Sequence, residues 1–235
     1  MNKKTDYIDE ELKKLEGNNR KLGNTQNALK YFGKCHSDFS YSFQKLNLGK
    51  RRRKPEHFQE RTLNSIQAKI NNIKDSNVRL ACNLGKYSGL RSFEICNIRK
   101  KDIEFTNEGV RVKIPYAKGG KSGIINCIRN TKLEQKLKEY LKNYSDDDKI
   151  FPSLPKMRLA AARAGIKLHD LRRGYSKIKL VKTMYDSNGK KVMNKPEAKE
   201  IVKENMLHSN SRTTDTYLYS KVIYQCSIGG KQIRI

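Results

Sequence analysis

The sequence has no run of about 18 apolar residues, the length that a membrane-spanning helix needs, so no transmembrane segment is expected. The first residues, Met1–Thr5, lead into no apolar run, and a secretory signal is not expected either. Acidic residues are scarce: 24 Asp and Glu stand against 51 Lys and Arg, a formal net charge of +27 over 235 residues. We therefore expect a folded, very polar protein that is intracellular, not secreted and not bound to a membrane.

Cysteine is also sparse, and none of the five thiols forms a C-x-x-C pair. The four histidines are too scattered to complete a zinc site by their spacing. We interpret the cysteines as buried or incidental thiols of a reducing compartment and expect no metal.

The large positive charge predicts a polyanionic partner, because the many cations on a folded surface repel one another unless a partner neutralises them. Nucleic acid is the natural candidate, since each neutralised phosphate releases counterions. A ribosomal-type RNA binder and a solvated basic surface are the alternatives. Charge alone says nothing about catalysis.

Five consecutive cations precede Pro55 and divide the sequence. They are Lys50, Arg51, Arg52, Arg53 and Lys54. We interpret them as a linker that binds along a DNA backbone; the alternative is a nuclear-localisation-like run or a solvated tether. The division predicts an N-terminal arm or linker over 1–54 and a main domain with a C-terminal tail over 55–235.

The first 50 residues have an uneven pattern. Gly-Asn steps at 17–19 and 23–24 are expected to interrupt any helix. Aromatic residues between Tyr31 and Phe43 predict either a small helical module or an arm that packs on a partner. The segment therefore allows a reduced DNA-binding module without defining one.

Beyond Pro55 the apolar residues become periodic. Steps of three and four predict amphipathic helices over 63–73 and 78–87, with a new helix start at 75–77 and an end or bend at Gly89. Further helices are expected over 133–141 and near 154–164, 169–183, 196–206 and 211–222, with a hairpin turn at 186–189.

Three short segments alternate apolar and polar residues. They cover 103–105, 110–114 and 124–128, and turns at 107–109 and 119–123 separate them. This pattern predicts a three-stranded antiparallel meander. The expected fold class is α+β, mainly helical, with this small sheet.

Cutting a DNA strand without a metal makes definite demands on side chains. Charge builds up on the non-bridging phosphate oxygens during attack, and arginine suits them best because its planar guanidinium binds two oxygens and stays protonated. The leaving 5′-oxygen needs a proton donor. A tyrosine nucleophile, with a pKa of about 10, needs a base or a hydrogen-bond partner.

Residues of these kinds stand in four segments. Arg91 follows Gly89 at a tight turn, and Glu94 comes one helical turn later, where it can orient a catalytic side chain. A hairpin tip carries Lys118 and, as a weaker candidate for the same role, Lys121.

The other two segments lie in the second half of the chain. His169 and Arg172 share one expected helical face, and Arg173 follows them. His208 precedes Tyr217 by nine residues, and Asn210 or Ser211 is expected to cap the helix that carries Tyr217. Each segment alone is explained by a turn, a solvated face or packing; their order and combination favour a catalytic site.

Together the segments resemble the motif boxes of the tyrosine recombinases, the integrase family. The G-L-R-x-x-E box matches at 89–94, the hairpin lysine at Lys118, the H-x-L-R-[HR] box at 169–173 and the H-S-x-x-x-T-T-x-x-Y box at 208–217. The resemblance covers about residues 55–225. It implies cleavage and rejoining of double-stranded DNA through a 3′-phosphotyrosyl intermediate, for recombination or integration of a mobile or viral element, without metal or cofactor.

The resemblance also implies a role for each residue. Arg91 and Arg172 would clamp the scissile phosphate, and Lys118 would protonate the leaving 5′-hydroxyl. His169 would be the general base or proton shuttle. The last box adds His208 as a hydrogen-bonding residue on the phosphate and Tyr217 as the nucleophile.

Three features depart from the family pattern. Leu207 stands where the family usually has glycine, the gap between the last two boxes is long, and residues 1–50 are short for the family's core-binding domain. Tyr219 competes with Tyr217, but on a helix it would point about 200° away. In this family the tail commonly docks on a neighbour, so we expect a homo-oligomer, a dimer or a tetramer on DNA, with packing on its own domain as the alternative.

Three rival functions remain at this point. A type IB topoisomerase resembles the same active site and would relax supercoils as a monomer. Telomere resolvases are usually much larger relatives. In a basic DNA-binding protein without catalysis, the motif matches would be coincidental or the site would have decayed. The presence of all six expected residues argues against decay.

Overall fold

The computed structural model describes residues 3–15, 19–36, 61–62, 65–115, 122–208, 210–219 and 222–235. Contacts along the chain divide it into two units, Met1–Phe58 and Gln59–Ile235. Each unit is described by itself. No helix within the described residues is long and apolar enough to cross a membrane.

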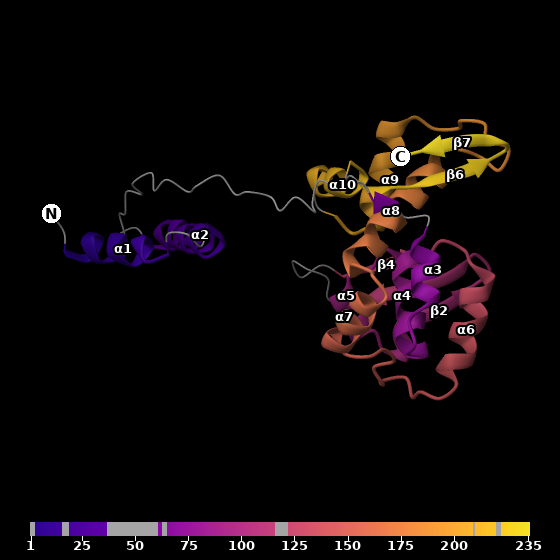
Figure 1. The fold of residues 1–235 in the computed structure, drawn as a ribbon, viewed down its shortest axis with the longest axis horizontal. Coiled ribbons are helices and arrows are strands. Elements are labelled where there is room, and N and C mark those ends of the chain that lie inside the picture. The colour runs from indigo at the N-terminus through magenta and orange to yellow at the C-terminus, as the bar shows by residue number, and fades with distance from the viewer. Residues whose placement is uncertain are drawn as a thin grey trace. The chain divides into compact units, whose positions relative to one another are not determined.

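Among its described residues, the first unit contains the helices α1 (Lys3–Lys13) and α2 (Asn19–Cys35) (Figure 1). Each helix buries one leucine almost completely, Leu12 in α1 and Leu22 in α2. The predicted interruption at residues 23–24 was wrong, because α2 runs straight through Gly23. A glycine inside a helix costs only about 1 kcal/mol relative to alanine, which an otherwise continuous helix tolerates. The predicted aromatic cluster beyond residue 36 lies outside the described residues.

The second unit alternates helices with short strands. Its first helices are α3 (Ile66–Asn71), α4 (Ser76–Ser88), α5 (Ser92–Asn97) and the 3-10 turn η2 (Lys100–Asp102). A sheet follows, made of β2 (Ile103–Thr106), β3 (Gly109–Ile114) and β4 (Gly123–Asn126). The later helices are α6 (Thr131–Leu141), α7 (Leu154–Arg163), α8 (Leu168–Met184), α9 (Lys195–Asn205) and α10 (Ser211–Leu218).

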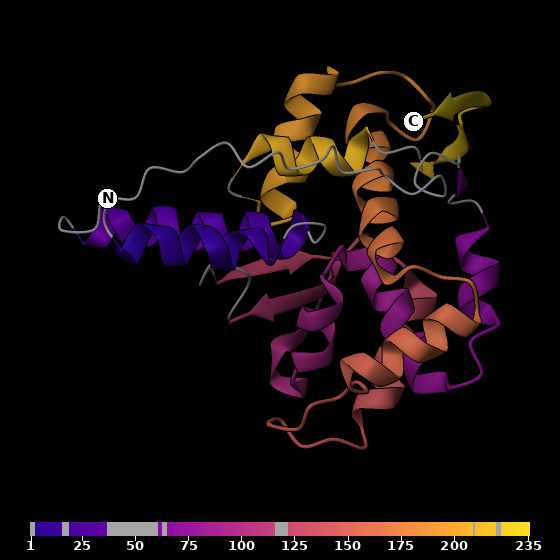
Figure 2. The ribbon, with the colours of Figure 1, turned by 60° about the vertical axis from the view of Figure 1, so that its left-hand side comes forward.

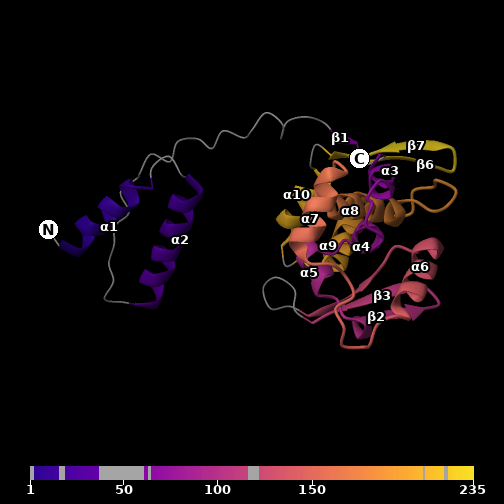
Figure 3. The same ribbon diagram turned by 60° about the horizontal axis from the view of Figure 1, so that its bottom comes forward.

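The sheet confirms the predicted meander. Its order is β2-β3-β4, and both pairs are antiparallel, with Val112 opposite Ile103 on one side and opposite Ile125 on the other. Val112 and Ile125 are buried, so one face of the sheet belongs to the core. Figure 3 shows β2 and β3 next to α6, which contacts β3.

Helix α4 begins and ends where the sequence predicted. The Asp75 carboxylate accepts the backbone N–H groups of Asn77 and Val78 at 2.9 and 3.0 Å, which caps the first turn. Gly89 ends the helix with φ +68°, in the left-handed region that glycine enters without strain. A β-carbon at Gly89 would lie 2.3 Å from the Tyr175 ring. Both constraints require glycine here, directly before Arg91.

The core of the second unit has two parts that meet at α8. One cluster gathers apolar side chains of α3 to α7 and the sheet, and the other gathers those of α8, α9 and α10. Helix α8 packs against α4 on one side and against α9 and α10 on the other. Figure 2 shows the two halves, with the α9 and α10 ribbons in gold. Residues from both halves can therefore converge on α8.

The C-terminal tail packs on its own domain. Strand β5 (Val222–Ile223) pairs in parallel with β1 (Arg61–Thr62), and β6 (Gln225–Ile228) forms a hairpin with β7 (Lys231–Arg234). At the hairpin tip, a β-carbon on Gly229 would lie 1.9 Å from the carbonyl oxygen of Asn188, in the predicted turn between α8 and α9. The single chain thus has the packing that we set beside docking on a neighbour, and the docking itself stays a prediction.

Candidate active site

Arg91 is held by Glu94 at the start of α5. The Arg91 backbone N–H donates to one carboxylate oxygen of Glu94 at 2.7 Å, and the guanidinium donates to the other at 2.8 Å. The Glu94 side chain is only 4% exposed, against 24% for Arg91. The carboxylate therefore orients the guanidinium from the protein side and leaves its other side accessible.

Arg172 is one of the most deeply buried polar residues in the described chain, with 1% exposed. Its Nη1 donates to the Gly89 carbonyl at the end of α4. Its Nη2 donates to the Met206 carbonyl and to Nε2 of His208, both at 2.7 Å. Burial, and then the charge of Arg91, lower the pKa of Arg172. The guanidinium nevertheless stays charged at neutral pH.

His208 lies between Arg172 and Thr214. Burial, followed by the charges of Arg172 and Arg91, lowers the pKa of His208 to about 3, so the ring is neutral at neutral pH. A guanidinium has only donors, and Nε2 must therefore accept from Arg172. The ring proton then sits on Nδ1, which donates to the Thr214 hydroxyl at 3.0 Å.

Tyr217 lies against this cluster from α10. Its ring packs 5.3 Å from the ring of His208 and 5.0 Å from that of His169, centroid to centroid. The Arg172 guanidinium carbon lies 5.5 Å from the same ring. Tyr217 is 6% exposed, whereas Tyr219 is 62% exposed and meets Lys195 instead. Of the two tyrosines, Tyr217 is the one beside the arginine.

The H-x-L-R-R segment lies on the first turns of α8, as its spacing predicts. Partial burial, then the charges of Arg173 and Arg172, lowers the pKa of His169 and favours a neutral imidazole. Arg173 pairs with Asp170 at 2.6 Å. His169 therefore flanks Tyr217 as a neutral ring.

Several predicted residues lie outside the described part of the chain. They are the hairpin residues Lys118 and Lys121 and the basic run Lys50, Arg51, Arg52, Arg53 and Lys54. Their roles stay predictions. No group of three or more His, Cys, Asp or Glu side chains within the described ranges is arranged to hold a metal ion.

The departure at Leu207 has a structural explanation. Leu207 is the one non-glycine residue with positive φ in the described ranges, at +51°. Glycine enters this region at little cost, whereas leucine pays about 1–2 kcal/mol. The Leu207 side chain packs on Gly123. A β-carbon added to Gly123 would lie 2.7 Å from Cδ2 of Leu207. Packing against β4 thus offsets part of the strain.

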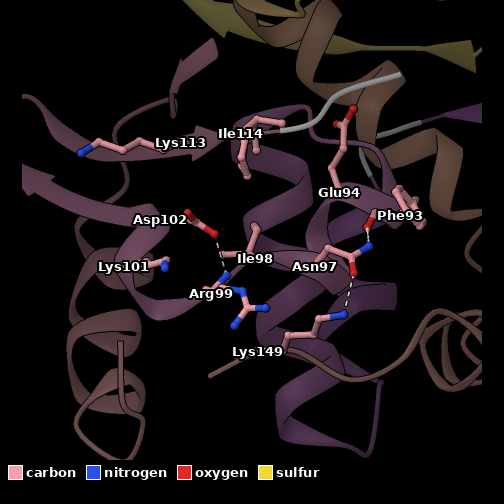
Figure 4. A pocket seen from close by; sticks show the side chains of 11 residues that line it. Phe93, Glu94, Asn97, Ile98, Arg99, Lys101, Asp102, Lys113, Ile114 and Lys149 are labelled. Atoms are coloured by element: carbon pink, nitrogen blue, oxygen red, sulfur yellow. Dashed lines mark hydrogen bonds between the residues drawn. The ribbon is translucent and has the colours of Figure 1, made fainter. Parts of the chain in front are cut away.

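A cavity of about 510 Å³ lies beside the cluster but is not part of it (Figure 4). Glu94 lines it, while none of Arg91, Arg172 and Tyr217 does. In Figure 4 the Glu94 carboxylate points away from Asp102 and Arg99, which hold each other through the Arg99 N–H and the Asp102 carboxylate at 2.8 Å. Among the predicted site residues that the structure describes, only Glu94 lines this cavity.

Sequence reasoning did not single out the groups that hold the site from behind. These are the carbonyls of Gly89 and Met206 and the hydroxyl of Thr214. The carbonyls carry no sequence signal, because every residue has one. Thr214 is one of the two threonines of the matched box at 208–217, and this position was the only feature of the sequence that could have indicated its role.

The sequence matches the model of the phage integrase family over residues 56–222. The chain belongs to the phage integrase family. A curated tyrosine recombinase of Pseudothermotoga lettingae is 28% identical over 224 residues, which are 91% of this chain and 77% of that protein.

Two solved structures show how far the integrase fold extends. The Tn1549 transposon integrase in complex with circular intermediate DNA matches with a TM-score of 0.59 and 15% identity, over 91% of this chain and 80% of that one. XerH bound to a palindromic difH substrate matches with a TM-score of 0.51 and 16% identity. The match covers 81% of this chain, which spans 60% of that XerH chain.

These findings confirm the predicted family, its catalytic fold and the enzyme class. The chain is a tyrosine-type recombinase whose activity is site-specific DNA recombination or integration. The comparisons do not favour topoisomerase-like relaxation as its function.

Proposed function

We propose that Tyr217 attacks one strand of double-stranded DNA and keeps the cut end as a 3′-phosphotyrosine, while Arg91 and Arg172 hold the scissile phosphate. The observation that carries the proposal is the packing of Tyr217 against the Arg172 guanidinium, at 5.5 Å, between two imidazoles. A phenol held there lies next to any phosphate that the arginine binds.

Arg172 has a donor available for that phosphate. Its Nε is buried and has no hydrogen-bond partner among the described residues. A buried donor without a partner costs about 1–3 kcal/mol. A phosphate oxygen would satisfy it, and the accessible side of Arg91 supplies a second cation for the charge that develops during attack.

His169 is the proposed general base. Its lowered pKa favours the neutral ring, which can accept the Tyr217 proton directly or through a water. As the phenolic oxygen bonds to phosphorus, the bond from phosphorus to the 5′-oxygen breaks, and Lys118 is proposed to protonate that oxygen. Attack by a 5′-hydroxyl on the phosphotyrosine reverses these steps and reseals a strand.

His208 is proposed to donate to the phosphate after Nη2 of Arg172 shifts its hydrogen bond from Nε2 to a phosphate oxygen and Nε2 takes up a proton from solvent. Burial, and then the charges of Arg172 and Arg91, lower the pKa of His208. A phosphate offsets those charges and so favours the protonated ring. Nε2 then has a proton for a phosphate oxygen.

The larger assembly is also part of the proposal. Lys50 to Lys54 and Lys121 would contact the DNA backbone, and two or four copies would bring two sites together for strand exchange. The DNA complex of the Tn1549 transposon integrase, which shares the fold, supports DNA from a mobile element as the substrate.

The test uses the nucleophile and its neighbour. Tyr217→Phe should bind a pool of nicked duplexes with unchanged affinity and form no covalent adduct, a loss of at least about three orders of magnitude in rate. Tyr219→Phe is the matched control and should still form the adduct, seen as a shifted band on a denaturing gel. An adduct that persists in Tyr217→Phe would assign the nucleophile elsewhere.

A further inference from the structure

Thr214 is a buried polar residue to which no step of the reaction has yet been assigned. It lies on α10, three residues before Tyr217, and is completely buried. A threonine in a helix commonly bonds its hydroxyl to the carbonyl four residues earlier. Exposed Thr216 does so, at 3.0 Å from the Arg212 carbonyl, whereas the Thr214 hydroxyl meets Nδ1 of His208 at 3.0 Å.

The direction of this hydrogen bond follows from the other side of the ring. Nη2 of Arg172 lies 2.7 Å from Nε2 of His208 and can only donate. Nε2 therefore carries the lone pair, Nδ1 carries the proton, and the Thr214 oxygen is the acceptor. The imidazole is held at both nitrogens, by α8 on one side and by α10 on the other.

We propose that Thr214 is a positioning residue of the recombinase, whose hydroxyl holds the Nδ1–H of His208 and so keeps Nε2 turned toward Arg172 and the scissile phosphate. The inference rests on the proposed role of His208. When Nη2 of Arg172 donates to the phosphate instead and Nε2 gains a proton for a phosphate oxygen, Nδ1–H can stay on the same hydroxyl. The ring then changes its protonation state without turning.

The location on α10 gives this contact a second consequence. Thr214 and Tyr217 share one face of the helix, since residues three apart lie on the same side. The hydrogen bond to His208 thus ties the helix of the nucleophile to the residue that faces the phosphate. Loss of the hydroxyl would loosen both at once.

The experiment compares Thr214→Val, which keeps the shape and removes the hydroxyl, with Thr214→Ser, which keeps the hydroxyl. Thr216→Val makes the same change at an exposed position of the same helix and is the matched control. The first readout is the Nδ1–H proton of His208 in the full-length chain labelled with 15N-histidine, assigned by its absence from His208→Asn. The second is the rate of adduct formation on a nicked duplex, with thermal unfolding to confirm folding.

We expect the downfield Nδ1–H signal in the wild type, in Thr214→Ser and in Thr216→Val, and its loss in Thr214→Val. Adduct formation should slow by about tenfold or more in Thr214→Val, the size expected for one lost hydrogen bond. Thr214→Ser should stay within about threefold of the wild type. Rescue by serine separates a role of the hydroxyl from one of packing.

Two results would overturn the inference. One is an unchanged Nδ1–H signal in Thr214→Val, which would show that the hydroxyl is not the acceptor. The other is adduct formation by Thr214→Ser that is as slow as that by Thr214→Val. This result would mean that Thr214 acts through packing and not through its hydroxyl. If the wild type forms no adduct while the signal depends on Thr214, the proposed function fails and the hydrogen bond stands.

Discussion

The two halves of the second unit differ in what they bury. The half built from α3 to α7 and the sheet has a large apolar cluster, and its buried polar residues are few among those described: Ser88, Glu94 and Asp102. The half built from α8 to α10 has a smaller apolar cluster and buries Asp170, Arg172, Ser176, Lys177, His208 and Thr214. The first half supplies stability and presents Arg91 at its edge. The second half has most of the candidate active site in its interior.

This difference predicts how stability and activity are coupled. A polar group inside a protein stabilises the fold only while its hydrogen bonds are complete. In the second half the same bonds orient the groups that we propose to be reactive, so one substitution should affect both stability and activity. In the first half a substitution in the apolar cluster should affect stability alone.

The largest effect that would sharpen this comparison is expected from Arg172→Ala. Cleavage should fall by about two orders of magnitude or more, because a cation at the phosphate is lost. Stability should fall as well, by about 1–3 kcal/mol for each buried partner left unsatisfied among the Gly89 and Met206 carbonyls and His208. Single-turnover cleavage and urea unfolding measure the two quantities.

Leu84→Ala is the control from the other half. Leu84 is completely buried in α4, and its truncation should cost about 2–5 kcal/mol of stability. The fraction that remains folded should cleave at the wild-type rate. Either of two results would contradict the difference between the halves. One is a lower cleavage rate per folded molecule of Leu84→Ala, and the other is a free energy of unfolding of Arg172→Ala equal to that of the wild type.

A smaller effect is expected at Leu207, where φ is +51°. Leu207→Gly relieves the left-handed strain, and Leu207→Ala keeps the strain while it loses the packing on Gly123. Glycine should therefore be more stable than alanine by about 1 kcal/mol, the reverse of their order in a helix. Denaturant unfolding of the two variants checks the order, and a more stable alanine variant would argue against strain at this residue.

The sequence predicted the parts of this molecule that local chemistry decides. The cap at Asp75, the helix end at Gly89 and the alternation around Val112 each act within a few residues, and the structure confirms all three. The break at Gly23 was wrong because the penalty for one glycine is small compared with the rest of a helix. Local signals are therefore reliable where they are strong.

Contacts between distant residues are what the sequence left open. Arg172 reaches the carbonyl of Gly89, 83 residues earlier, and no pattern in either segment indicates that pair. The tail is similar, since Gly229 approaches Asn188 only because two turns meet in space. The motif boxes pointed to His169, Arg172, His208 and Tyr217, which the fold brings together, while Lys118 of the same boxes lies outside the described residues.

The central claim is that one chain carries a complete site, with Tyr217 beside its own Arg172. Mixing Tyr217→Phe with Arg172→Ala on a nicked duplex tests it, because each variant has what the other lacks. A site completed within one chain predicts that the mixture forms no adduct, while wild type mixed with either variant still does. Restored adduct formation in the mixture would mean that the tyrosine acts on a phosphate held by another copy, which would contradict the account.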